Sequence, residues 1–195
     1  MNFKKLLFIT LSLISINSFA DKNADTVSLY MRENGGRNDY FAMDLYKNGN
    51  IVGGQTSSGG QVYLKVDKGT YAGLAGSRQL TSLKCVNNQC SGFISGHSAD
   101  FSLVSDTKGS IVAEKHSTFN MRTLEFLRTE NRIYIRVGAL GLFDVKRGAN
   151  GVYRGTATVY GRLFPYEVTL TTKGALDFSD PVLATIFLGS LVSGH

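Results

Sequence analysis

The stretch GVYRGTATVYGRLFPYEVTLTTKG, residues 151–174, contains the clearest structural pattern in the chain. Small or apolar residues occupy alternate positions on both sides of an interruption at Phe164-Pro165. A period of two residues, enriched in β-branched and aromatic side chains, is typical of strands that bury one face. The stretch therefore predicts a β-hairpin.

Related patterns extend outward from this hairpin. Residues 94–109 align with residues 159–174 without a gap, and both segments end in Thr-Lys-Gly. Alternating apolar residues, separated by turns rich in glycine and asparagine, occur in most of the chain. These patterns predict an all-β, antiparallel fold, either a β-barrel or a two-sheet meander of about 10–12 strands. They also indicate two related halves, at about residues 62–109 and 133–174.

Two segments leave the choice between helix and strand open. Residues 122–129 combine leucines with threonines, and the turn that follows favours a hairpin over a short helix. Near the C-terminus, Asp180 before Pro181 is typical of a helix start. Residues 182–192 then have almost no polar face, so we expect a short buried helix that closes one end of a barrel or packs between its walls. A buried last strand is the alternative.

Residues 1–20 have the features of an export signal. A positively charged start precedes an apolar core, and the segment ends in small residues at Ala20. The apolar core is too short for a helix that crosses a membrane. We therefore predict cleavage after Ala20, a single β domain over residues 21–195, and a periplasmic or secreted location.

The two cysteines flank the turn Asn87-Asn88. With this pair as the loop of a hairpin, Cys85 and Cys90 lie opposite each other at a non-hydrogen-bonded site, where Cα atoms are about 4.5–5.5 Å apart. Since we expect an oxidising compartment, the spacing predicts a Cys85–Cys90 disulfide. A redox pair usually has a closer spacing, and two thiolates supply only half of a closed zinc site.

Composition and spacing disfavour several function classes. The formal net charge is +6, but the basic residues form no long run, and nucleic acid is not an expected partner. The three histidines have no metal-ligand spacing, so no metal or cofactor is predicted. His97 and Asp100 are suggestive, but a tight turn seldom brings a histidine within reach of both partners in a catalytic triad. No catalytic residue is assigned, and we do not expect an enzyme.

Tyrosines near glycines are the candidate ligand-binding residues. The pattern Gly-x-Tyr-x-Gly occurs around Tyr71 and around Tyr153, and Tyr166 lies in the predicted hairpin of residues 151–174. Glycines two positions from a tyrosine share its strand face, which leaves room for the ring over a neighbouring backbone. Packing alone is the alternative role for these rings. The glycine-rich residues 53–60 offer either an anion cradle or an ordinary inter-strand loop.

These observations favour a non-enzymatic binding or interaction protein of the cell envelope. Its partner would be a small apolar or lipid-like ligand in the barrel lumen, or another envelope protein. A small outer-membrane β-barrel is the first alternative, and it would bring direct membrane contact. An envelope hydrolase without a recognisable motif is the second alternative.

Overall fold

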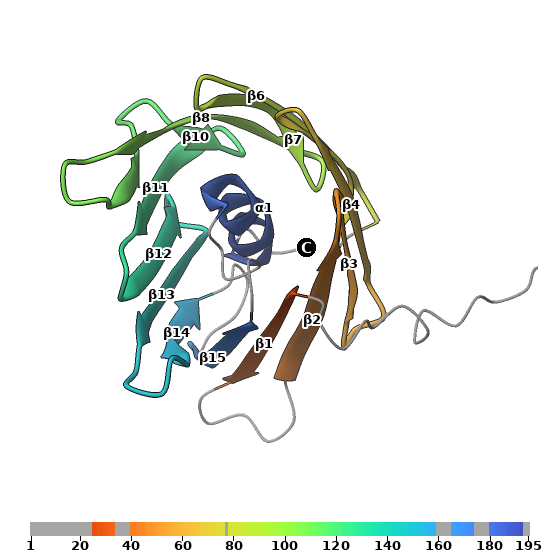
Figure 1. Cartoon of the computed structure of the whole chain (residues 1–195), viewed down its shortest axis with the longest axis vertical. Helices are drawn as coiled ribbons and strands as arrows, with labels where there is room; N and C mark the ends of the chain where they lie inside the picture. The colour runs from red at the N-terminus through yellow and green to blue at the C-terminus, as the bar shows by residue number, and fades with distance from the viewer. Residues whose placement is uncertain (1–24, 34–39, 77, 159–164, 174–179, 193–195) are drawn as a thin grey trace, which may run out of the picture.

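The computed structural model describes residues 25–33, 40–76, 78–158, 165–173 and 180–192 (Figure 1). In these residues the chain forms fifteen strands and one helix, in the order β1 (Asp25–Glu33), β2 (Tyr40–Asn48), β3 (Ile51–Thr56), β4 (Gln61–Asp67), β5 (Thr70–Ala75), β6 (Leu80–Val86), β7 (Gln89–Ile94), β8 (His97–Ser105), β9 (Ile111–Ala113), β10 (Thr118–Phe119), β11 (Arg122–Arg128), β12 (Arg132–Val137), β13 (Gly141–Arg147), β14 (Tyr153–Thr158), β15 (Tyr166–Lys173) and α1 (Pro181–Val192). The predicted export signal, residues 1–20, and the predicted strand positions 159–163 lie outside the described residues.

The strands form one closed antiparallel sheet. Strands that follow one another in the chain pair with each other, with the exception of β9 and β10, and β15 pairs with β1. Both β9 and β10 pair with β8 and with β11, so these two short strands make one interrupted position in the wall. The result is a closed 14-strand barrel, which confirms the predicted antiparallel β fold and decides for a barrel over two sheets. The barrel has more strands than the about 10–12 expected from turn spacing.

Side chains alternate between the inside and the outside of the barrel. In β12, Ile133 and Ile135 are fully buried inside, whereas Arg132, Tyr134 and Arg136 lie on the outer face. This alternation places the apolar residues of each strand in one common core. The strand β11 follows the same rule, so the predicted hairpin over residues 122–129 is confirmed against the helical alternative.

The predicted disulfide is present in the hairpin formed by β6 and β7. Asn87 and Asn88 form its two-residue turn, with φ angles of 50° and 67°, as a type I′ turn requires. Cys85 pairs directly with Cys90 in the ladder, and the two sulfur atoms are bonded at 2.07 Å. The bond links neighbouring strands of one hairpin and closes a short loop.

The C-terminal helix α1 lies inside the barrel, beside β5, β12 and β13 (Figure 1). The helix prediction is therefore confirmed, and the alternative of a last strand is wrong. Of the two expected positions, the helix packs between the walls. It fills space that the barrel wall alone would leave open.

The two ends of the barrel differ because of this helix. We define the helix-entry end as the end where β15 finishes and α1 begins. The turns at this end are residues 49–50, 68–69, 87–88, 106–110, 129–131 and 148–152.

Candidate binding site in the barrel lumen

The inner wall of the barrel is predominantly apolar. Its buried side chains come from strands all around the ring. Figure 1 shows how these strands surround α1. The largest fully buried wall residues are Phe101, Phe119, Phe143, Leu29, Leu45, Leu64, Leu83, Ile94, Leu124, Ile133 and Ile135. A lumen of this kind fits an apolar occupant, because burial of apolar surface is favourable by about 25 cal/mol per Å².

The helix α1 is the occupant of this lumen. All residues from Val182 to Leu191 are buried. The hydroxyl groups of Thr185 and Ser190 donate to carbonyl oxygens within the helix, at 2.8 and 2.9 Å. A helix of 12 residues that is apolar on all sides would be marginal in water, so the lumen supplies its stability.

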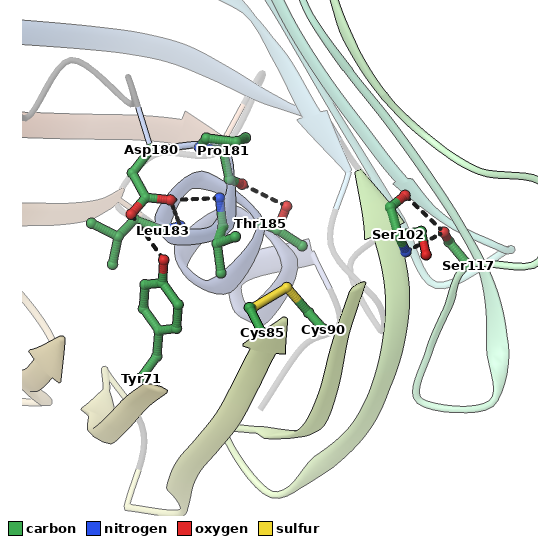
Figure 2. The surroundings of a disulfide bond; sticks show 10 residues. Tyr71, Cys85, Cys90, Ser102, Ser117, Asp180, Pro181, Leu183 and Thr185 are labelled. Atoms are coloured by element: carbon green, nitrogen blue, oxygen red, sulfur yellow. Dashed lines mark hydrogen bonds between the residues drawn. A yellow bond between two sulfur atoms is a disulfide. The ribbon is translucent and has the colours of Figure 1, made fainter. Parts of the chain in front are cut away.

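A pair of residues ties the start of α1 to the wall at the helix-entry end (Figure 2). One carboxylate oxygen of Asp180 accepts hydrogen bonds from the backbone N–H groups of Val182 and Leu183, at 2.9 and 3.2 Å. The other accepts a hydrogen bond from the Tyr71 hydroxyl at 3.0 Å. We call Tyr71 and Asp180 the latch. The sequence identified Asp180 as a helix cap, but its role as the partner of Tyr71 was missed.

The chemistry of the latch favours a neutral tyrosine. Burial raises the pKa of Tyr71, and the nearby Asp180 carboxylate raises the pKa further through its charge and its hydrogen bond. The phenol therefore stays protonated across the neutral range and remains a donor to Asp180.

The other two candidate tyrosines also point inward but do not join Tyr71. Tyr153 is buried on β14, its hydroxyl donates to the Glu130 carbonyl at 3.4 Å, and the Arg147 guanidinium carbon lies 5.9 Å from its ring centroid. Tyr166 is buried at the start of β15. These strands lie in a different part of the wall from β5. The three rings thus line one lumen without forming one cluster.

His97 and Asp100, the pair that suggested a catalytic site, lie on opposite faces of one strand. Both residues belong to β8, since the turn is Ser95-Gly96 and not the segment 96–100 as the sequence indicated. The His97 ring packs edge-on against Phe119, with centroids 5.8 Å apart, whereas Asp100 is exposed on the outer face. In the part of the chain that the structure describes, no three residues of His, Cys, Asp or Glu are grouped to hold a metal.

The glycine-rich segment forms an ordinary turn rather than an anion cradle. The backbone N–H groups of Thr56, Gly59 and Gly60 donate to oxygen atoms within the turn, and that of Ser57 donates to the Ala42 carbonyl. A surface pocket of about 450 Å³ lies beside this turn, and a second pocket of about 340 Å³ lies at the helix-entry end, between the turns 106–110 and 129–131.

The chain was compared with protein families, curated proteins and solved structures. No protein-family model, curated protein or solved structure matches the chain. Within the described residues, no helix is long and apolar enough to cross a bilayer.

Proposed function

We propose that the protein is an exported, non-enzymatic binding protein of the cell envelope whose barrel lumen accepts a small apolar or lipid-like ligand. The observation that carries this proposal is the occupied lumen: an apolar wall surrounds a helix that is itself apolar on all sides. Because α1 and a ligand would need the same space, the ligand enters as the helix withdraws. The latch sets how readily that exchange occurs.

The outer wall favours an aqueous location over the outer-membrane alternative. Outward-facing residues of β12 to β14 include Arg132, Arg136, Asp144, Lys146 and Arg154. Strands that face lipid have the reverse pattern, with an apolar band outside and polar groups inside. The polar exterior of these three strands supports a periplasmic or secreted protein.

The test weakens the latch without changing the wall. Tyr71→Phe removes the hydroxyl that bonds Asp180 and keeps the ring. A lost hydrogen bond to a charged group is worth about 1.5 kcal/mol, so the helix-withdrawn state should become about tenfold more populated. We expect the variant to bind the neutral apolar probe N-phenyl-1-naphthylamine about tenfold more tightly than the native protein, measured by fluorescence titration.

The matched control is Tyr63→Phe, because Tyr63 is 52% exposed on the outer face of β4 and does not touch the lumen. This variant should bind the probe as the native protein does. If the native protein and the Tyr71→Phe variant both ignore the probe, the lumen is not a binding site for apolar ligands.

A further inference from the structure

Three basic residues lie side by side on the outer face of the barrel at the helix-entry end. In the strand register, Arg132 of β12 is directly opposite Lys146 of β13, and Lys146 is directly opposite Arg154 of β14. We call these three residues the basic row. Side chains directly opposite each other on antiparallel strands have Cβ atoms about 4.5–5.5 Å apart. The row therefore concentrates three positive charges within a short distance.

One member of the row is compensated. Asp144 accepts two hydrogen bonds from the Arg132 guanidinium, at 2.8 and 2.7 Å, and the Arg132 guanidinium carbon lies 5.1 Å from the centroid of the Tyr134 ring. This arrangement fixes Arg132 in place. The hydrogen bonds from Arg132 hold the pKa of Asp144 below its ordinary value, and the charge of Lys146 lowers this pKa further.

The rest of the row is under-compensated. Lys146 and Arg154 are exposed, and neither forms an ion pair among the residues that the structure describes. The outward carboxylates nearest in register to Arg154 are Asp144 on β13 and Glu167 on β15, and both are opposite Thr156 rather than Arg154. Like charges on directly opposed strand positions are unfavourable, so the row reduces the stability of the free protein.

An exposed tyrosine and a surface pocket lie beyond the two ends of the basic row. Along the register, Arg154 is followed by Thr169 and then by Tyr30, whose side chain is 46% exposed. Beyond the other end of the row, Lys108, Arg128 and Glu130 line the pocket at the helix-entry end, where Arg128 is opposite the inward-facing Ile133. Cations next to an exposed tyrosine are typical of a surface that meets lipid headgroups.

We propose that the basic row docks the helix-entry end of the barrel on a bilayer that contains anionic phospholipid. This docking goes beyond the proposed lumen binding and does not depend on it. The charge complementarity of three neighbouring cations with phosphate headgroups carries the proposal, and the exposed Tyr30 lies two strands beyond Arg154 in the same register. The barrel lies with the mouth that α1 occupies toward the membrane.

The test is sedimentation of the full exported chain with vesicles of phosphatidylglycerol and phosphatidylcholine in equal parts. We expect the native protein to bind these vesicles at low salt, to leave them as salt screens the charges, and to ignore vesicles of phosphatidylcholine alone. The double variant Lys146→Gln with Arg154→Gln should bind about 30-fold more weakly, because each cation near an anionic surface contributes about fivefold.

The matched control is Lys115→Gln with Arg78→Gln, since both residues are exposed and lie outside the turns of the helix-entry end. This control should bind as the native protein does. An equal loss in both double variants, or equal binding to neutral vesicles, would overturn docking through the basic row. Absence of binding at low salt would also overturn it, and an acidic protein would then be the partner to seek.

A variant that binds more tightly distinguishes docking through the basic row from a loss of binding caused by misfolding. Asp144→Asn removes the carboxylate that compensates Arg132 and keeps the size of the side chain. We expect this variant to bind anionic vesicles several-fold more tightly, about fivefold for one added effective charge. Unchanged or weaker binding by folded Asp144→Asn protein would contradict the proposal.

Discussion

The latch connects two residues that are 109 positions apart in the chain. Tyr71 was predicted as a candidate ligand-binding residue from the spacing of its neighbouring glycines, which is a local pattern. Asp180 was predicted as a cap from the Asp-Pro dipeptide, which is also local. Their hydrogen bond could not be predicted, because it depends on where the barrel closes around the helix. The basic row was missed for the same reason, since it needs the register of three strands.

The raised pKa of Tyr71 makes the latch sensitive to alkaline pH. A folded-state pKa above the ordinary value of 10.0 means that the stabilisation is complete below pH 10 and is lost as pH rises through the folded pKa. We expect the native protein to exceed Tyr71→Phe in stability by about 1.5 kcal/mol at neutral pH. This difference should shrink and then reverse above pH 10, as measured by urea unfolding at each pH. A difference that is independent of pH would contradict the latch.

At the scale of elements, local patterns predicted the hairpins well. The Cys85–Cys90 hairpin was predicted in full because its turn residues, its pairing and its bond all lie within ten residues or so. The expected strand count was too low, and the short strands β9 and β10, of 3 and 2 residues, account for only one position of the shortfall. The strand β3 was recognised only at its start, since glycines occupy its centre.

The disulfide should stabilise its hairpin without holding the barrel together. A loop of this length corresponds to about 2 kcal/mol in the chain-entropy model. We expect Cys85→Ser with Cys90→Ser to lower the free energy of unfolding by about this amount and to leave the strand content unchanged, as measured by urea unfolding and far-ultraviolet circular dichroism. Loss of the folded barrel in the double variant would show that the bond does more than staple one hairpin.

One charged side chain introduced into the buried centre of α1 should displace the helix from the lumen. Ile186 is fully buried at the centre of α1, and an unpaired carboxylate there is strongly unfavourable. We expect Ile186→Asp to expel the helix, so that its amides exchange hydrogen rapidly while the strands stay protected. The control is Ser91→Asp on the exposed outer face of β7, which should leave exchange in α1 slow. Slow exchange in α1 of Ile186→Asp would mean that the lumen accommodates polar groups.

At the scale of the whole molecule, closure is the property that gives the chain a lumen. Alternation along each strand fixes which side chains share a face, and it was readable from the sequence. Closure depends on the pairing of β15 with β1 and on the double pairing of β8, which no local pattern contains. The apolar strand faces therefore predicted a core. Only the structure shows that the chain's own helix occupies the lumen.

We propose that the lumen is a binding site that an apolar ligand enters when α1 withdraws. It is tested most directly by native mass spectrometry of protein exported to a periplasm and purified without detergent. We expect an added mass that is lost on denaturation and that is more abundant in Tyr71→Phe than in the native protein. Bare spectra for both proteins, with α1 still protected in the variant, would contradict it.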